Sequence, residues 1–242
     1  MSGGAKNIVY NIKQCFFDII FPKYCLFCGQ EGTDWCSTCQ AKEILAWDKV
    51  CFKCHQTDVE LGLCDQCREL YFFDGLICAA SYEDKIISTL IQTYKYRFVK
   101  DLTLPLGRLI AKNLEKELLN SKAIFFSYFF KSVVMAVPLS KRRQNWRGFN
   151  QAEEIAKVVA NYFKLSYDNN LKRLKHCQAQ AKLTEQERLT NITGSFSFTG
   201  TAPEKVILID DVITTGATVN ECAKVLRAAG AEEILVLACA KG

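Results

Sequence analysis

A short stretch of the chain, residues 206–230, constrains the fold most strongly. Four apolar residues at 206–209 predict a buried strand, and the pair Asp210 and Asp211 follows directly. The small residues at 214–218 then lead straight into a predicted helix. A strand, an anion-binding loop and a helix in this order are typical of open α/β sheets, whose ligands bind beyond the carboxyl ends of the strands.

The loop at 214–218 has the composition of a phosphate cradle. Thr218 and Glu221 fit a capping box, which predicts that the helix begins at Thr218, with its free amides and positive dipole end toward the loop. Gly216 lets a phosphate approach the backbone closely. The preceding pair of acids can accept hydrogen bonds from a sugar diol and lie near a magnesium ion. Neither the Walker loop nor the Gly-x-Gly-x-x-Gly fingerprint occurs, so both of these nucleotide-binding classes are disfavoured.

The composition divides the chain near residue 70. The chain has 242 residues and is 49% hydrophobic, which is enough for one sizeable core and a small additional unit. Residues 1–70 are interpreted as an N-terminal helix and a cysteine-rich module, and residues 71–242 as an α/β domain. In the second part, apolar runs predict strands at 76–82, 133–137, 206–209 and 234–240, and helices at 84–96, 104–119 and 151–163.

Eight of the thirteen cysteines fall in four Cys-x-x-Cys pairs. A two-residue spacing aims two thiolates at one ion, and two such pairs complete the tetrahedral sulfur shell that zinc prefers. Two tandem structural zinc sites are favoured, although an interleaved pairing fits the same spacing. Disulfides are the weaker alternative in a reducing compartment. The paired residues are Cys25 and Cys28, Cys36 and Cys39, Cys51 and Cys54, and Cys64 and Cys67.

Two other functions of the cysteine-rich module are disfavoured. Cys51, Cys54 and His55 match the attachment pattern of c-type haem, but three similar pairs and the missing export signal argue against haem. Aromatic residues between the pairs can stack nucleobases beside lysines, or they can form the small core of the module, which is the favoured interpretation. These residues are Phe27, Trp35, Trp47 and Phe52, beside Lys23, Lys42, Lys49 and Lys53.

No segment has the pattern of a secretory signal or of a membrane span, which favours a cytoplasmic protein. The most apolar internal stretch, 123–137, is interrupted by polar residues and is shorter than the roughly 20 residues of a spanning helix. Apolar residues between Ile8 and Phe21 fall at helical spacing. Docking of this segment on the protein's own body is favoured, and a peripheral location at the inner face of the membrane is the alternative.

Residues 206–218, VILIDDVITTGAT, resemble the signature with which type I phosphoribosyltransferases bind phosphoribosyl diphosphate (PRPP). From Ile8 onward the chain further resembles the ComF family of competence-associated proteins. The resemblance implies a type I phosphoribosyltransferase-like domain with a central, mostly parallel sheet, preceded by a small zinc-ribbon-like module. Beside the cysteine pairs, it is carried by Lys95-Tyr96, Val137-Pro138-Leu139, Arg147-Gly148-Phe149-Asn150-Gln151, Gln180-x-x-Leu183 and Arg188-x-x-Asn191.

The resemblance also implies a site for PRPP with magnesium. The two acids would hold the ribose hydroxyls, the loop at 214–218 the 5-phosphate, and residues 138–147 the diphosphate. Residues 177–198 would form a loop over the sugar. The implied catalytic residues are Asp210, Asp211, Arg147 and Arg188. The implied PRPP-binding residues are Asp210, Asp211, Val212, Thr214, Thr215, Gly216, Ala217, Thr218, Lys95, Ser140 and Lys141.

A physical argument agrees with a diphosphate site. A strand that ends at Val137 delivers Lys141, Arg142, Arg143 and Arg147 to the same sheet edge, with no acid among them. A solvated helix face is the commoner origin of such a basic run. Joined to the phosphate loop, the run favours an anionic ligand.

The function implied by the resemblance is transfer of the phosphoribosyl group to an acceptor, linked to DNA uptake or nucleotide salvage. Nothing in the sequence nominates the acceptor. The alternative is a non-catalytic module that senses PRPP or a nucleotide and binds single-stranded DNA with the competence machinery. A purely structural zinc scaffold is least favoured, because the PRPP signature is intact.

Overall fold

The computed structural model describes residues 22–42, 44, 47, 50–57, 59–120, 131–174 and 192–242. Its contacts divide the chain into two compact units, Met1–Glu43 and Ile44–Gly242. The second cysteine group therefore belongs to the same unit as the sheet, which differs from the boundary expected near residue 70. The predicted N-terminal helix lies outside the described residues.

The first unit is organised around its four cysteines. Tyr24 and Glu31 form an antiparallel bridge that closes the turn carrying Cys25 and Cys28. The short helix α2, Ser37–Gln40, follows and carries Cys39. Backbone hydrogen bonds tie the two halves together, including one of 3.0 Å from the Leu26 amide to the Asp34 carbonyl.

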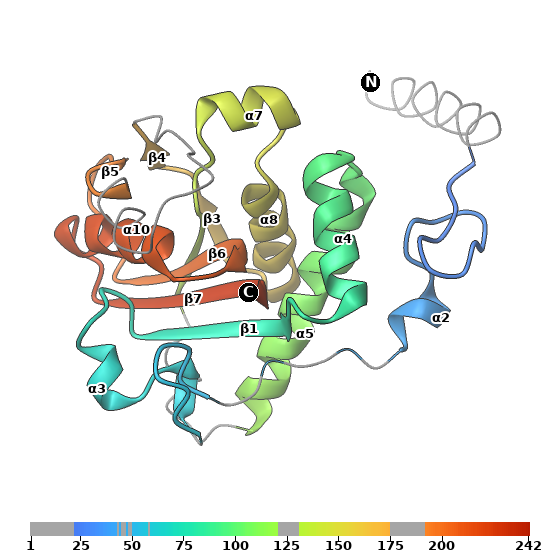
Figure 1. The fold of residues 1–242 in the computed structure, drawn as a ribbon. Coiled ribbons are helices and arrows are strands. Elements are labelled where there is room, and N and C mark those ends of the chain that lie inside the picture. The colour runs from blue at the N-terminus through green and yellow to red at the C-terminus, as the bar shows by residue number, and fades with distance from the viewer. Residues whose placement is uncertain are drawn as a thin grey trace. The chain divides into compact units, whose positions relative to one another are not determined.

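A five-stranded parallel sheet forms the centre of the second unit (Figure 1). Its strand order is β1-β7-β6-β2-β3, and all four pairings are parallel. Because the strands are parallel, their carboxyl ends meet at one edge of the sheet. The strands are β1 Gly75–Ser81, β2 Val133–Ala136, β3 Ser166–Asp168, β6 Lys205–Ile213 and β7 Glu233–Lys241.

Helices cover both faces of this sheet. Helices α5 and α8 pack together and against the strands. Helix α10 packs on the other face, where its buried side chains join alternate residues of β1, β6 and β7 in one core. Helix α4 carries five buried residues, among them Tyr94. These helices are α4 Lys85–Tyr96, α5 Thr103–Asn120, α8 Gln151–Phe163 and α10 Ala217–Ala228.

The second cysteine module covers the same sheet face as α10. Phe52, Val59 and Leu63 share a core with Leu76 of β1 and with apolar residues of α10. The packing is close, because a Cβ added to Gly62 would lie 2.1 Å from the Leu76 carbonyl oxygen. The module consists of the Cys51–Cys54 turn, the 3-10 turn η1 Glu60–Gly62 and helix α3 Asp65–Arg68.

Smaller elements surround the carboxyl edge of the sheet. A separate two-stranded antiparallel sheet lies beside α10 and is joined to it through β5. Helix α7 follows β2 at the position expected to be a diphosphate loop. These elements are η2 Lys100–Leu102, α7 Lys141–Arg147, β4 Leu171–Arg173 and β5 Phe196–Phe198.

The predicted fold class is confirmed: an α/β domain around a parallel sheet, with two four-cysteine clusters in the N-terminal part. In the described part of the chain, no helix has both the length and the apolar character that a membrane crossing requires.

Candidate functional site

A cavity of about 680 Å³ opens at the carboxyl ends of β2 and β6. Two acids, Asp210 and Asp211, stand among five cationic side chains, so the cavity is suited to an anion that also carries hydroxyls or a metal ion. The cationic residues are Lys95, Arg142, Arg143, Arg147 and Arg173.

Asp211 is paired with Lys95 across the cavity. Its carboxylate lies 2.8 Å from the Lys95 ammonium, which the last turn of α4 supplies. Burial lowers the pKa of Lys95, but the carboxylates of Asp211 and Asp210 outweigh burial and hold that pKa above its ordinary value. The lysine therefore stays charged and holds Asp211 in place. The structure brings Lys95, predicted as a phosphate contact, directly beside the acid pair.

Asp210 has a different environment from its neighbour. Burial, followed by the charge of Asp211, raises the pKa of Asp210 to about 7. Its Oδ1 accepts a hydrogen bond of 2.8 Å from the Asp211 amide. Near neutral pH this carboxyl is thus poised to lose its proton when a cation approaches. Asp210 is therefore the member of the pair whose charge can adjust to a ligand.

Arg147 lines the same cavity as the acids. It is 9% exposed and donates a hydrogen bond of 2.9 Å to the Gln151 side chain. Burial lowers the pKa of its guanidinium, although Asp211 opposes the change, and an arginine remains protonated at any physiological pH. Among the residues that the structure describes, no acceptor pairs with the buried Nε of Arg147. A buried cation with an unused donor is suited to an anionic ligand.

Two hydrogen bonds hold helix α7, which carries Arg147, in position. Ser140 caps the helix, because its hydroxyl accepts a hydrogen bond of 3.4 Å from the Arg143 amide. Asn150 donates a hydrogen bond of 3.1 Å to the Val137 carbonyl, which ties the end of α7 back to the end of β2. Of the two predicted contacts in this segment, Ser140 is the cap, and Lys141 faces a neighbouring cavity of about 420 Å³ instead.

The phosphate loop differs in detail from the prediction. Helix α10 begins at Ala217 with Gly216 as its N-cap, so the expected start at Thr218 was one residue late. The expected capping box is absent because the Glu221 carboxylate accepts a hydrogen bond of 2.8 Å from the Gly194 amide. Val212 and Thr218 line the large cavity together with the acids. The other predicted loop residues, Thr214, Thr215, Gly216 and Ala217, lie between them in the chain and do not line that cavity.

The second cysteine module supports this loop. Gly216 has a φ of +76°, and a Cβ added there would lie 3.0 and 3.1 Å from two ring carbons of Phe52. Phe52 in turn packs against Tyr71 and Phe73, with ring centroids 5.1 and 6.1 Å apart. The loop backbone therefore packs on an aromatic cluster whose first residue, Phe52, lies between Cys51 and Cys54 in the chain.

Helix α10 is tied to the segment that follows the same module. The Arg227 guanidinium contacts both carboxylate oxygens of Asp74, at 2.6 and 2.7 Å, and donates to the Phe72 carbonyl at 3.0 Å. The Phe72 amide donates to the Asn220 side chain at 2.8 Å. Helix α10 is thus held through Asn220 and through Arg227 by the segment that contains Phe72 and Asp74.

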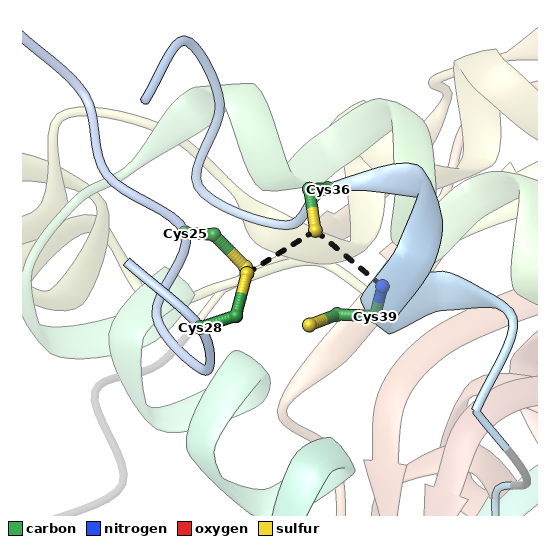
Figure 2. A group of neighbouring side chains, drawn as sticks. All are labelled: Cys25, Cys28, Cys36 and Cys39. Atoms are coloured by element: carbon green, nitrogen blue, oxygen red, sulfur yellow. Dashed lines mark hydrogen bonds between the residues drawn. The ribbon is translucent and has the colours of Figure 1, made fainter. Parts of the chain in front are cut away.

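The eight paired cysteines gather in two tandem groups, as the spacing favoured. Within each group the four sulfur atoms lie within 4.8 Å of one another. Figure 2 shows the first group, in which the Cys28 and Cys36 sulfurs are 3.5 Å apart. In the second, the corresponding distance between Cys54 and Cys64 is 3.6 Å. Four converging thiols fit a structural zinc ion and leave no coordination position for substrate.

Of the four aromatic residues named between the cysteine pairs, Trp35 and Phe52 are buried, whereas Phe27 and Trp47 are partly buried. Trp35 and Phe52 are 4% and 5% exposed, and Trp47 is partly buried, with the Lys241 ammonium 5.5 Å from its ring centroid. This agrees with the favoured interpretation over base stacking. Arg188 and most of the predicted loop over the sugar lie outside the described residues. Arg173 and Trp146 also line the cavity, although neither belongs to the motifs that predicted the site.

Comparisons with known proteins extend these observations, although no protein-family model matches the chain. Competence protein F of Haemophilus influenzae is 29% identical over 228 residues, which are 85% of this chain and 96% of that protein. Competence protein ComFC of Streptococcus pneumoniae is 28% identical over 232 residues, 87% of this chain and 96% of that protein. DNA utilization protein YhgH of Salmonella typhi is 31% identical over 107 residues, 43% of this chain and 46% of that protein.

Two solved structures show weaker likenesses. One is described as the allosteric regulatory enzyme of purine biosynthesis, with a TM-score of 0.35, 21% identity and coverage of 57% of this chain and 26% of that one. The other is TT1426 from Thermus thermophilus, with a TM-score of 0.31, 13% identity and coverage of 57% and 82%. These scores are too low to inform the function of the site.

The fold and the two sulfur clusters define an α/β protein with a parallel central sheet and, in its N-terminal part, two four-cysteine clusters of the kind that binds structural zinc. The full-length relatives confirm the resemblance to the ComF family that the sequence motifs predicted.

Proposed function

We propose that this chain binds PRPP with magnesium in the large cavity and transfers the phosphoribosyl group to an acceptor. One observation carries the proposal: a partly buried acid pair and five cations surround one cavity, at the end of β6 from which the chain leads into α10. The names of the relatives favour a role of this activity in DNA uptake or utilization. A cytoplasmic location is part of this proposal, because four-thiol clusters that hold zinc require the reduced cysteines of a reducing compartment.

In this proposal each group of residues has a separate task. Asp210 and Asp211 accept hydrogen bonds from the ribose hydroxyls, and the 5-phosphate lies at the start of α10, where Thr218 lines the cavity. Arg142, Arg143 and Arg147 hold the diphosphate, whose negative charge grows as its bond to the sugar breaks. When bound, magnesium neutralises part of the charge on the diphosphate. Arg188 would act from the loop over the sugar.

The enzyme hypothesis has a direct test. Purified zinc-loaded protein is mixed with magnesium, PRPP and a broad panel of nucleobases, and the release of diphosphate is measured. We expect release that depends on both magnesium and an acceptor and that falls at least about 100-fold in Asp211→Asn, because that change removes a charge facing the sugar. Glu232→Gln, beyond the opposite end of the sheet, is the matched control. No turnover with any acceptor would contradict catalysis.

A second candidate is a non-catalytic module that binds PRPP or a nucleotide and also single-stranded DNA. The cationic side chains around the cavity and the names of the relatives favour it. Such binding releases counterions, so retention of an oligonucleotide should fall steeply with salt. Retention that is undetectable or insensitive to salt would exclude this candidate.

A further inference from the structure

Three large aromatic side chains lie exposed and in contact at the mouth of the cavity. Tyr96, Phe98 and Trp146 are 58%, 38% and 57% exposed. The Trp146 ring centroid lies 6.0 Å from that of Tyr96, at an interplanar angle of 59°, and 5.4 Å from that of Phe98, at 82°, so a flat ligand stacks on one of these rings and meets the others at an angle. Single exposed aromatics are ordinary on protein surfaces, but a contiguous group marks a binding site. We call these three residues the aromatic platform.

The platform continues into the cationic cavity. Tyr96 and Trp146 are part of the cavity lining. The guanidinium of Arg147 lies 5.5 Å from the Tyr96 ring centroid and 6.0 Å from that of Trp146. This buried cation supports the two rings, and its Nε has no partner in the described part of the chain. Arg142 and Arg143 line the same cavity from the helix that carries Trp146.

The combination selects one kind of ligand. Aromatic rings recognise a flat base by stacking, and arginines recognise phosphates through charge-assisted hydrogen bonds. A cavity of about 680 Å³ has the size of a small-molecule site, which is large enough for one nucleotide with its phosphates. A purely apolar partner does not fit, because the surface beside the rings is cationic.

We propose that the aromatic platform stacks a nucleobase whose 5′-phosphates enter the cavity, so that the site takes a nucleoside diphosphate or triphosphate in competition with PRPP. The inference rests on the proposed use of the cavity for phosphates. It adds a base-recognition subsite formed by Trp146, Tyr96 and Phe98, and it makes the occupancy of the PRPP site dependent on the free nucleotide concentration.

The test is a titration of the full zinc-loaded chain with ADP, CDP, inorganic diphosphate and PRPP, each with magnesium. Binding is followed by calorimetry and by tryptophan fluorescence. Trp146 should dominate the fluorescence response, because neither Trp35 nor Trp47 lines the cavity. We expect both nucleotides to quench the fluorescence and to be displaced by PRPP. Trp146→Ala should weaken both nucleotides about 5- to 150-fold, the range for loss of one stacked base, and leave diphosphate and PRPP within about twofold.

Two further variants keep the result interpretable. Trp146→Phe should restore most of the nucleotide affinity without the fluorescence response, because a phenyl ring still stacks. Tyr162→Ala removes an exposed aromatic on α8, where Tyr162 bonds Glu115 instead of lining the cavity, and should change nothing.

The outcomes separate this inference from the proposed function. If PRPP binds and the nucleotides do not, or if Trp146→Ala leaves nucleotide affinity unchanged, the base subsite is wrong while the PRPP site stands. If only oligonucleotides bind with dependence on Trp146, the platform serves a strand and the inference is overturned. If nucleotides bind and PRPP does not, the base subsite stands and the proposed function fails.

Discussion

Phe52 packs its ring edge against Gly216, so a residue of the second cysteine module forms the floor of the phosphate loop. A side chain at Gly216 would be strained by the φ of +76°, and its Cβ would lie 3.0 Å from the ring, so Phe52 would have to shift. A four-thiol cluster that leaves no coordination position for substrate is thereby connected to the site through packing.

Replacing this ring should loosen the loop. Phe52→Ala removes a 5% exposed side chain, and we expect the free energy of unfolding to fall by about 3 kcal/mol. We also expect affinity for magnesium-PRPP to fall about tenfold, because the loop backbone loses its support. Phe73→Ala, in the same aromatic cluster, serves as the control for stability alone. Equal losses of affinity in both variants would show that the Gly216 contact has no particular role.

The two sulfur clusters should differ in their effect on the sheet domain. Cys67→Ser and Cys39→Ser each remove one buried thiol from a four-cysteine group. Only the second group lies within the compact unit of the sheet, so we expect Cys67→Ser to lower its melting temperature by several degrees. Cys39→Ser should leave it within about 2 °C. Scanning calorimetry with a zinc assay checks this, and the reverse order would contradict the assignment of the units.

The raised pKa of Asp210 predicts a pH dependence of binding. A sugar diol or a cation prefers the ionised carboxylate, whereas burial favours the protonated form with a pKa of about 7. Ligand binding below pH 7 must therefore expel a proton, and affinity should fall up to about tenfold for each pH unit below 7. Asp210→Asn should bind weakly and lose this slope. A flat profile between pH 5.5 and 8 in the unmodified protein would sink this assignment.

The raised pKa of Asp210 also makes the stability of the unliganded protein depend on pH. The pKa of Asp210 in the folded protein is raised above the ordinary value of 3.8. The stabilising contribution of Asp210 to the free energy of unfolding is therefore fully present below pH 3.8 and is lost as the pH rises through about 7. Asp210→Asn should remove this loss, which denaturant unfolding at pH 6 and pH 8 measures.

Asp74 is the anchor between the second module and the sheet. It receives both Arg227 contacts and a hydrogen bond of 2.7 Å from the Ile234 amide. We expect Asp74→Ala to lower the free energy of unfolding by about 1–2 kcal/mol, since the ion pair is partly exposed and the amide loses its acceptor. Urea denaturation measures the loss. An unchanged midpoint of urea denaturation would show that water replaces the Asp74 contacts with no loss in the free energy of unfolding.

The sequence predicted the main elements of the domain because their apolar periodicity is strong. Helix α8 has the predicted bounds, and each predicted strand lies within or beside an observed one. Helix α7 was missed because its residues 141–147 are almost entirely polar, so its cap at Ser140 and the left-handed Gly148 define it instead of a hydrophobic stripe. The short strands β3, β4 and β5, of three residues each, leave too little periodicity to detect.

The sequence predicted those site residues that belong to local motifs. The acid pair and Lys95 were named from motifs and meet in the structure. The roles of Arg173 and Trp146 depend on which residues from distant segments line one cavity, and no local pattern carries that information. The same holds for Phe52, whose contact with Gly216 joins residues 164 positions apart in the chain.

Calorimetric titration of magnesium-PRPP into the zinc-loaded protein, beside an Asp210→Asn/Asp211→Asn double variant, tests the central claim most directly. The account predicts binding at one site in the unmodified chain and its loss in the double variant, with the variant's fold retained by circular dichroism. Absence of binding in the unmodified chain, or equal binding by both proteins, would contradict it.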